Sequence, residues 1–168
     1  AFHAGNFADC LKHALLVWIV RALGRKPAPF RVLDTHAGAG AYDLGSEEAR
    51  RGGEWQAGIG RLLGVTEGPL ADYAALVRDS GAPARYPGSP ELVRALLRPE
   101  DRLVCVELHP EEHAALRARF RADPRVSVHR RDGWEALRAL TPFPERRGLV
   151  LMDPPFERPG EFERLPEG

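Results

Sequence analysis

Hydrophobic residues recur at helical spacing near the start of the chain, which predicts a helix over residues 6–23. The residues that would share its apolar face are Leu11, Leu15, Trp18 and Ala22. Asn6 can accept a hydrogen bond from the first turn, and Asp9 three residues later resembles a capping box. Gly24 favours an end to the helix, so we expect a linker before the next element.

After this linker, short apolar runs alternate with helical patterns. The runs predict strands over residues 30–33, 103–108, 126–129 and 149–152, and the patterns predict helices over residues 111–121 and 133–140. Such alternation is typical of a mostly parallel sheet with helices on both faces. The predicted fold class is therefore α/β, of the Rossmann-like kind.

The segment between the first two of these strands follows a different pattern. Residues 54–63 and 70–79 have helical patterns, and no convincing strand is present in the segment. We interpret residues 45–90 as a small helical insertion within a single domain that spans residues 1–168. The chain opens without a methionine, and we expect it to be trimmed at both ends, with the last strands of the sheet beyond its final residue.

The composition excludes few classes of partner. The chain has 24 Lys and Arg against 24 Asp and Glu, a formal net charge of +0. A neutral total neither demands nor excludes a nucleic acid, because binding depends on a local patch. The arginines that could contact the phosphates of a nucleic-acid backbone are Arg117, Arg119, Arg121, Arg125, Arg130 and Arg131. A solvated helix face and strand edge explain this run at least as well.

Two cysteines and the lack of long apolar stretches favour a protein of the reducing cytoplasm. Cys105 lies in an apolar run, where a buried reduced thiol is the ordinary interpretation. No segment approaches the length of a membrane span, and no signal peptide is visible. We expect a cytoplasmic monomer without a membrane partner.

Four predicted strands end in a distinctive polar or glycine group. In chain order the groups are Asp34 with Gly38 and Gly40, then Glu107, then Asp132-Gly133, then Asp153-Pro154-Pro155-Phe156. In an open α/β sheet, ligands bind beyond the carboxyl ends of the strands. Four such groups in order indicate a ligand site more specifically than any one alone.

The glycine group suits a nucleoside without phosphates better than a dinucleotide. Gly38 and Gly40 let the backbone approach a ligand closely, but a pyrophosphate fingerprint would need a glycine where Asp43 stands. Glu107 could accept hydrogen bonds from both ribose hydroxyls, and Asp132 could accept the adenine amino group while it also caps a helix. Taken singly, these residues are also explained by a tight turn, a solvated acid and a helix cap.

The segment from Asp153 to Phe156 carries the strongest chemical signal. Two prolines fix the backbone, so that a carbonyl can point rigidly into a pocket. Hydrogen bonds from an exocyclic amine to the Asp153 carboxylate and the Pro154 carbonyl would favour a pyramidal nitrogen with an exposed lone pair. Asp153 could then take the proton that the nitrogen loses, and Phe156 offers a ring on which a flipped base can stack. The alternative is a structural Asp-Pro turn.

A second pattern suggests a different class of protein. His109-Pro110-Glu111-Glu112-His113 matches H-x-x-E-H, a zinc-peptidase motif. Pro110 is expected to be the first helical residue, so that His109 precedes the helix and His113 lies on it. No third ligand is evident, and we expect no metal site.

Together these segments resemble the bacterial ribosomal RNA large-subunit methyltransferase J family, which methylates an adenine N6 in 23S ribosomal RNA. The segments that carry the resemblance are Phe2-His3-Ala4-Gly5-Asn6, Leu11-Lys12-His13, residues 33–40, Tyr86-Pro87-Gly88-Ser89-Pro90, Glu107-Leu108-His109-Pro110, Asp132-Gly133 and Asp153-Pro154-Pro155. The resemblance covers essentially the whole chain. It implies a class I methyltransferase fold, S-adenosylmethionine as methyl donor and ribosomal RNA as partner.

The resemblance also implies roles for individual residues. The residues implied to contact the donor are His13, His36, Ser89, Glu107, Asp132 and Gly133. Asp153 is implied to be the catalytic acceptor, and Lys12 to lie beside donor and substrate. Phe156 departs from the family's usual tyrosine but keeps a ring for stacking. The alternatives are a DNA adenine-N6 or cytosine-N4 methyltransferase, a zinc peptidase, and a donor-binding module without activity.

Overall fold

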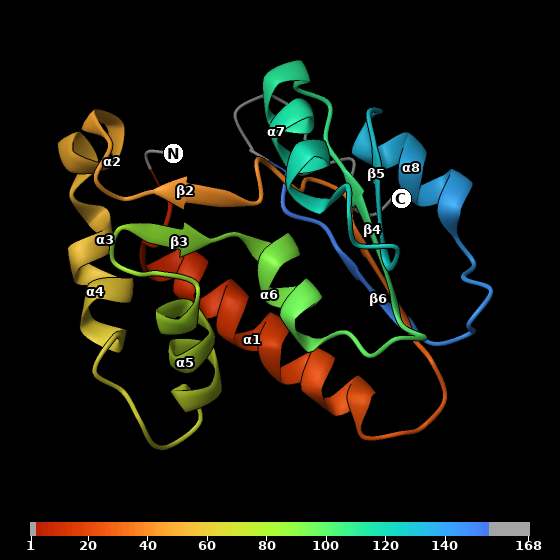
Figure 1. Cartoon of the computed structure of the whole chain (residues 1–168), viewed down its shortest axis with the longest axis horizontal. Helices are drawn as coiled ribbons and strands as arrows, with labels where there is room; N and C mark the ends of the chain where they lie inside the picture. The colour runs from red at the N-terminus through yellow and green to blue at the C-terminus, as the bar shows by residue number, and fades with distance from the viewer. Residues whose placement is uncertain (1–2, 155–168) are drawn as a thin grey trace. The chain divides into compact units, whose positions relative to one another are not determined.

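The computed structural model describes residues 3–154, and they form two compact units that we treat separately. Described residues of the first unit are 3–25 and 40–96, and those of the second are 26–39 and 97–154. Figure 1 labels the elements of both. The prediction of a single domain with an insertion remains a prediction, but the inserted residues share their compact unit with the N-terminal helix.

The second unit is built on a four-stranded parallel sheet with the order β5-β4-β1-β6. The strands are β1 (Arg31–Asp34), β4 (Arg102–Val106), β5 (Val126–His129) and β6 (Gly148–Leu151). All four were predicted, with small shifts at their ends. The parallel sheet confirms the predicted Rossmann-like α/β class.

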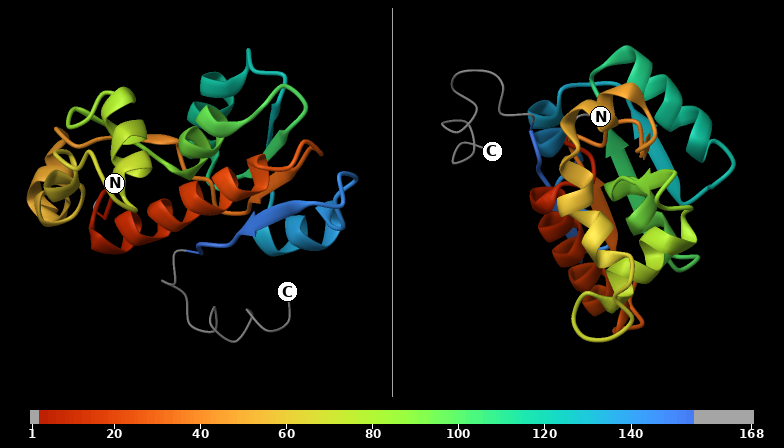
Figure 2. Two further views of the ribbon diagram at one scale, coloured as in Figure 1. Left: turned by 90° about the horizontal axis from the view of Figure 1, so that it is seen from below. Right: turned by 90° about the vertical axis from the view of Figure 1, so that its left-hand side faces the viewer.

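Two helices, α7 (Pro110–Phe120) and α8 (Gly133–Leu140), join the strands of this sheet. The chain moves outward from β4 to β5 through α7 and returns to the other side of β1 through α8. Because both crossovers are right-handed in such folds, the helices cover opposite faces, as Figure 2 shows. On the α8 face, Ala136 and Leu137 pack against Leu33, Val104 and Val106.

Cys105 is the buried thiol that the sequence predicts in this sheet. The residue is fully buried and its sulfur is free of any disulfide. Burial raises the pKa of the Cys105 thiol well above its usual value, and the nearby Asp34 carboxylate raises it further. The thiol is therefore protonated and unreactive at neutral pH.

In the first unit, helix α1 (Phe7–Gly24) forms as predicted. The Asn6 side chain caps it by accepting the Asp9 backbone N–H at 2.9 Å. The predicted apolar face is wrong, however: Leu11 and Trp18 are 54% and 67% exposed. The face that packs into the unit instead holds Cys10, His13, Leu16, Val17 and Val20. Tertiary contacts therefore bury the helix face that contains the polar residue His13.

The remainder of the first unit contains an unpredicted two-stranded antiparallel sheet. Strands β2 (Ala41–Asp43) and β3 (Arg85–Pro87) pair with each other, which corrects the interpretation of this segment as free of strands. The helices are α2 (Glu47–Gly52), α3 (Glu54–Ala57), α4 (Ile59–Leu62), α5 (Ala71–Asp79) and α6 (Ser89–Leu96). Gly58 divides the predicted helix over 54–63 into α3 and α4, because its backbone leaves the helical region there.

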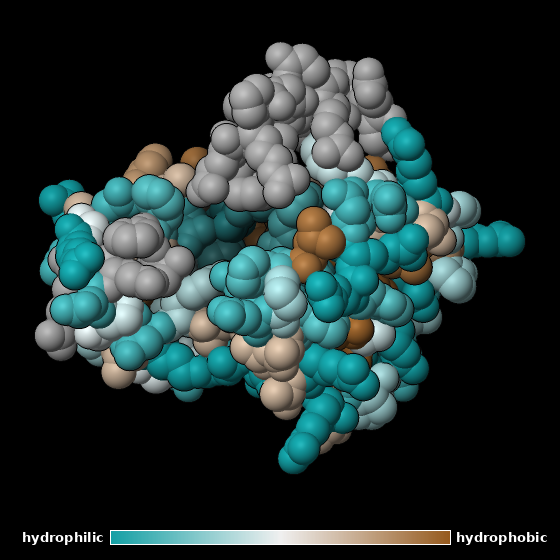
Figure 3. Space-filling model, turned by 90° about the horizontal axis from the view of Figure 1, so that it is seen from above, coloured by the Kyte–Doolittle hydropathy of each residue, from teal (hydrophilic) through white to brown (hydrophobic). Residues whose placement is uncertain are grey.

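One face of the molecule is mainly polar. On the face shown in Figure 3, hydrophilic residues predominate and hydrophobic residues form small separate patches. Among the described residues, no helix is both long enough and apolar enough to span a membrane.

Candidate functional site

In the second unit, the loop after β1 lies at the carboxyl edge of the parallel sheet and is held by both neighbouring strands. The Thr35 N–H donates to the Leu151 carbonyl at 3.0 Å, and the Ala37 N–H donates to the Val106 carbonyl at 2.9 Å. The chain order reverses at β1, since β4 and β5 lie on one side of it and β6 on the other. Ligands of open α/β sheets bind outside this kind of switch point.

Gly38 makes the sharp turn of this loop possible. Its φ of 61° lies in the left-handed region, where a side chain would be strained. Its N–H donates to Glu107 Oε2 at 2.9 Å, while Glu107 Oε1 accepts the His109 N–H at 2.7 Å. The carboxylate at the end of β4 is thus fixed against the glycine loop. Each of its oxygens has a further lone pair with which to accept a ligand hydroxyl.

His36 is oriented by the residue before it. Thr35 Oγ1 lies 3.1 Å from the Leu151 carbonyl oxygen, to which it donates, and 2.8 Å from His36 Nδ1. A hydroxyl has one proton, so His36 donates from Nδ1 to the threonine oxygen. The ring lies edge-on to Trp134, with centroids 6.4 Å apart. The first turn of α8 therefore borders the loop after β1.

Gly133 is the residue that allows this close approach. A Cβ at position 133 would lie 2.5 Å from the Thr35 carbonyl oxygen and 2.8 Å from His36 Cε1. Asp132 beside it caps α8 by accepting the N–H groups of Trp134 and Glu135 at 2.9 and 3.1 Å. This confirms the predicted cap. It also fixes the Asp132 carboxylate at the same edge of the sheet.

We expect Gly133→Ala to destabilise the protein by about 1–3 kcal/mol, because the added methyl overlaps backbone that cannot rotate away. Gly24→Ala is the matched control, since a Cβ at Gly24 would meet nothing within 4 Å. Urea unfolding of the two variants and the parent measures the difference. Equal midpoints for Gly133→Ala and the parent would show that the loop has room to move.

Asp153 and Pro154 follow the end of β6, which pairs with β1 in the register Asp34↔Leu151. Asp153 therefore lies two residues beyond the strand end, at the edge where the loop after β1 begins. Pro154 is buried and Asp153 is half-buried. Phe156 and Pro155 lie outside the described residues, so the predicted stacking ring is not placed.

In the first unit, α1 carries Lys12 and His13. Lys12 Nζ forms an ion pair with Asp9 Oδ1 at 2.7 Å, and Asp9 Oδ2 accepts the Gly5 N–H at 3.0 Å. Burial alone would raise the pKa of Asp9. The charge that His13 carries when protonated, the charge of Lys12, and the hydrogen bonds from Lys12 and Gly5 together hold that pKa below its usual value. Lys12 is thus part of a fixed local pair.

Gly40 and Ser89, also predicted donor contacts, lie next to the paired strands β2 and β3: Gly40 directly precedes β2, and Ser89 lies two residues beyond the end of β3. The Gly88 N–H donates to the Gly40 carbonyl at 2.8 Å, and Gly40 has a φ of 83°. A side chain at Gly88 would crowd that carbonyl at 3.1 Å. Ser89 is buried at the first position of α6.

The predicted site residues are divided between the two units. The group in the second unit is His36, Gly38, Glu107, Asp132, Gly133, Asp153 and Pro154; the group in the first unit is Lys12, His13, Gly40 and Ser89. Three residues near these side chains were not predicted from sequence. Thr35 orients His36, Tyr86 Oη lies at hydrogen-bonding distance from His13 Nδ1, and Tyr73 Oη lies at hydrogen-bonding distance from Tyr86 Oη. A buried tyrosine needs a hydrogen-bond partner, but its identity is not visible in the sequence.

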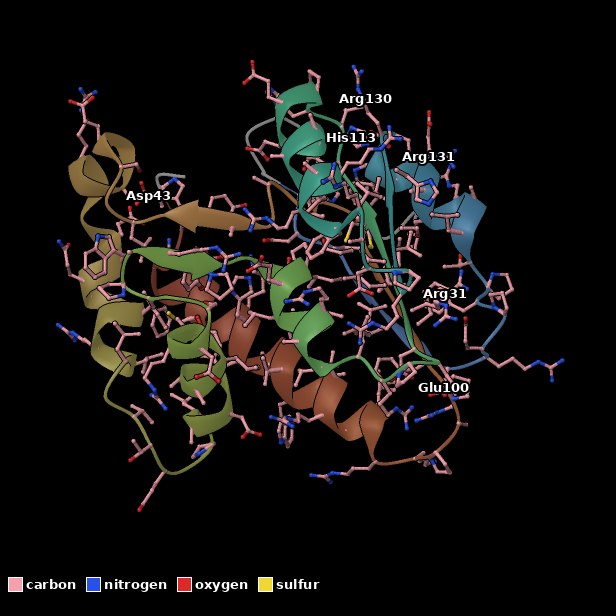
Figure 4. All side chains as sticks on the ribbon, in the orientation of Figure 1. Arg31, Asp43, Glu100, His113, Arg130 and Arg131 are labelled. Atoms are coloured by element: carbon pink, nitrogen blue, oxygen red, sulfur yellow. The ribbon has the colours of Figure 1, made fainter. Side chains whose placement is uncertain are left out.

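Neither alternative pattern gains support from the described residues. His109 is the N-cap residue of α7 and His113 lies within the helix (Figure 4). No group of three or more His, Cys, Asp or Glu residues in the described part of the chain is arranged to hold a metal. In the arginine run, Arg125 is bound to Asp123 and to the Leu97 carbonyl, whereas Arg130 and Arg131 follow β5.

Comparison with known proteins decides which family contains this arrangement. A family model described as Ribosomal RNA large subunit methyltransferase D, RlmJ matches residues 27–168. The chain belongs to this family. The match confirms the resemblance found in the sequence, and it includes every predicted site residue of the second unit.

Members of the family with known names or structures are similar over the whole chain. Ribosomal RNA large subunit methyltransferase J of Escherichia coli (strain K12) is 44% identical, over 100% of this chain and 62% of that protein. The protein of the same name from Haemophilus influenzae is 42% identical, over 97% and 60%. A crystal structure of a Legionella pneumophila protein has a TM-score of 0.88 at 35% identity, covering 98% of this chain and 62% of that one. The chain spans about three-fifths of the length of the curated relatives that it matches.

Proposed function

We propose that this chain carries the donor site and catalytic motif of an S-adenosylmethionine-dependent methyltransferase acting on adenine N6 of 23S ribosomal RNA. The observation that carries the proposal is the carboxyl edge of the second unit's sheet. There Glu107, at the end of β4, is held against the Gly38 turn that follows β1. Asp153 follows β6, which pairs with β1 on its other side. The curated relatives are named as ribosomal RNA methyltransferases, which supports the reaction class.

The residues at this edge fit a methionine-linked nucleoside. Its ribose is a diol, which matches the two fixed oxygens of Glu107. Its adenine has an amino group, which matches the Asp132 carboxylate held at the start of α8. It has no phosphates, which suits a glycine loop whose Gly38 N–H is already bonded to Glu107. On the family resemblance alone, we extend the proposed donor contacts to His13, Gly40 and Ser89 and place Lys12 beside them.

In the reaction, S-adenosylmethionine would supply a methyl group made electrophilic by its sulfonium. The lone pair of an adenine amine is delocalised into the ring, so the amine is a poor nucleophile. Hydrogen bonds to the Asp153 carboxylate and the Pro154 carbonyl would localise that lone pair on nitrogen. As the nitrogen–carbon bond forms and the carbon–sulfur bond breaks, Asp153 would take the proton that leaves the nitrogen. Phe156 is proposed to stack the flipped base.

Transfer of a tritiated methyl group tests the proposal and its nearest rival. Labelled S-adenosylmethionine is incubated with the protein and either 23S ribosomal RNA or duplex DNA of matched length. Label in the RNA alone is the expected result. Label in the DNA alone would instead assign the site to a DNA amino-methyltransferase, and label in neither would indicate a donor-binding module.

A further inference from the structure

Thr35 is a buried residue of the second unit that connects the end of β6 to the His36 ring. Its hydroxyl oxygen lies 3.1 Å from the Leu151 carbonyl oxygen and 2.8 Å from His36 Nδ1. Its backbone N–H donates to the same Leu151 carbonyl at 3.0 Å. Thr35 is 1% exposed, so these bonds are shielded from bulk water.

The Leu151 carbonyl fixes the direction of both hydroxyl bonds. A carbonyl oxygen can only accept, so the single hydroxyl proton of Thr35 points to Leu151. The hydroxyl oxygen can then only accept from His36, which must carry a proton on Nδ1. This direction holds for the neutral ring and for the charged ring alike, and it does not depend on what His36 Nε2 binds.

Contacts on several sides hold the His36 ring in one orientation. Thr35 binds Nδ1, and the Trp134 ring packs edge-on with centroids 6.4 Å apart. The Cε1–Nε2 edge faces Gly133, where a Cβ would lie 2.8 Å from Cε1 and 3.0 Å from Nε2. His36 is half-buried, whereas Thr35 and Ala37 on either side of it are buried. The ring is therefore fixed from the inside of the unit and partly exposed on its outside.

We propose that Thr35 is a positioning residue for the methyl donor: by accepting the Nδ1 proton of His36, its hydroxyl keeps that ring in the orientation that contacts S-adenosylmethionine. The proposal rests on the proposed function and on the donor contact that the family resemblance implies for His36. A side chain that is ordered before its ligand arrives loses less conformational freedom on binding. Thr35 therefore increases affinity for the donor without touching it.

Two variants separate the hydroxyl of Thr35 from its shape. Thr35→Val removes the hydroxyl but keeps the branched shape and the backbone N–H that donates to Leu151. Thr35→Ser keeps the hydroxyl and removes a methyl group. If Thr35 acts only through packing, Thr35→Val should resemble the parent more closely than Thr35→Ser does. The proposal predicts the opposite order.

Proton–nitrogen NMR of the donor-free protein with nitrogen-15-labelled histidine reports the bond to His36 directly. The signals of His36 are those that disappear in His36→Asn. We expect a ring N–H signal from His36 Nδ1 in the parent and in Thr35→Ser, because a hydrogen bond protects that proton from exchange with water. The signal should be lost in Thr35→Val, since the Nδ1 proton then has no hydroxyl to bind. An Nδ1 without a proton in the parent, or a signal that persists in Thr35→Val, would overturn the proposed bond.

Calorimetric titration with S-adenosylmethionine tests the link to the donor. Thr35→Val should bind about threefold to tenfold more weakly than the parent, the usual effect of ordering one side chain on binding, and Thr35→Ser should bind as the parent does. Equal affinities of Thr35→Val and a donor-binding parent would overturn the positioning role and leave the proposed function intact. A parent that binds no S-adenosylmethionine would contradict the proposed function itself, while the bond between Thr35 and His36 is judged by the Nδ1 signal alone.

Discussion

Replacing Asp153 with alanine should reduce the rate of methyl transfer by about 100-fold or more, the usual contribution of a positioned acid or base. The amine gains positive charge only as the methyl group arrives, so the carboxylate stabilises the transition state and not the bound donor. Affinity for S-adenosylmethionine should therefore stay near that of the parent. Single-turnover methylation of a ribosomal RNA fragment at saturating donor measures the rate, and calorimetry measures the affinity.

Asp153→Asn is the control that separates charge from shape. Its amide oxygen can still accept a hydrogen bond, but it carries no charge and cannot take a proton. We expect it to restore little of the lost rate. If Asp153→Ala methylates RNA at the parent rate, the Asp153-Pro154 segment is a structural turn and the acceptor lies elsewhere.

Removing the Glu107 carboxylate should weaken donor binding by about 1.5–3 kcal/mol, the range for a hydrogen bond to a charged group. Glu107→Ala loses the proposed ribose contact, and it also leaves the N–H groups of Gly38 and His109 without their carboxylate. The glycine turn should become less ordered as a result. Calorimetric titration with S-adenosylmethionine measures the change in the dissociation constant.

Glu111→Ala is a suitable control for this variant, because Glu111 is an exposed acid in the first turn of α7. It changes the net charge equally and should bind the donor as the parent does. An unchanged dissociation constant for Glu107→Ala would remove Glu107 from the donor site.

The second unit could be predicted from sequence because its signals are local. Each strand is a short apolar run, and a residue that the sequence itself marks follows its end: Glu107 comes directly after β4, and Asp153 lies two residues after β6. A parallel sheet places all carboxyl ends of its strands at one edge, and the observed register Asp34↔Leu151 agrees with this expectation. The candidate site residues of this unit could therefore be proposed from the sequence alone.

The first unit was harder because its organisation depends on distant pairings. Strands β2 and β3 have three residues each and lie more than 40 positions apart, and β3 contains Pro87, which argues against a strand. Helix α1 has apolar residues on more than one face, so periodicity located the helix but not its buried side. The contact of His13 with Tyr86 spans 73 positions, which no local pattern reports.

The central claim is tested most directly by nucleoside mass spectrometry of 23S ribosomal RNA from a strain that lacks this gene. The RNA is digested before and after incubation with S-adenosylmethionine and either the parent protein or Asp153→Ala. The account predicts that the parent adds N6-methyladenosine and that Asp153→Ala adds little in the same time. A methyl group that appears on another atom or base, or an Asp153→Ala product equal to that of the parent, would contradict it.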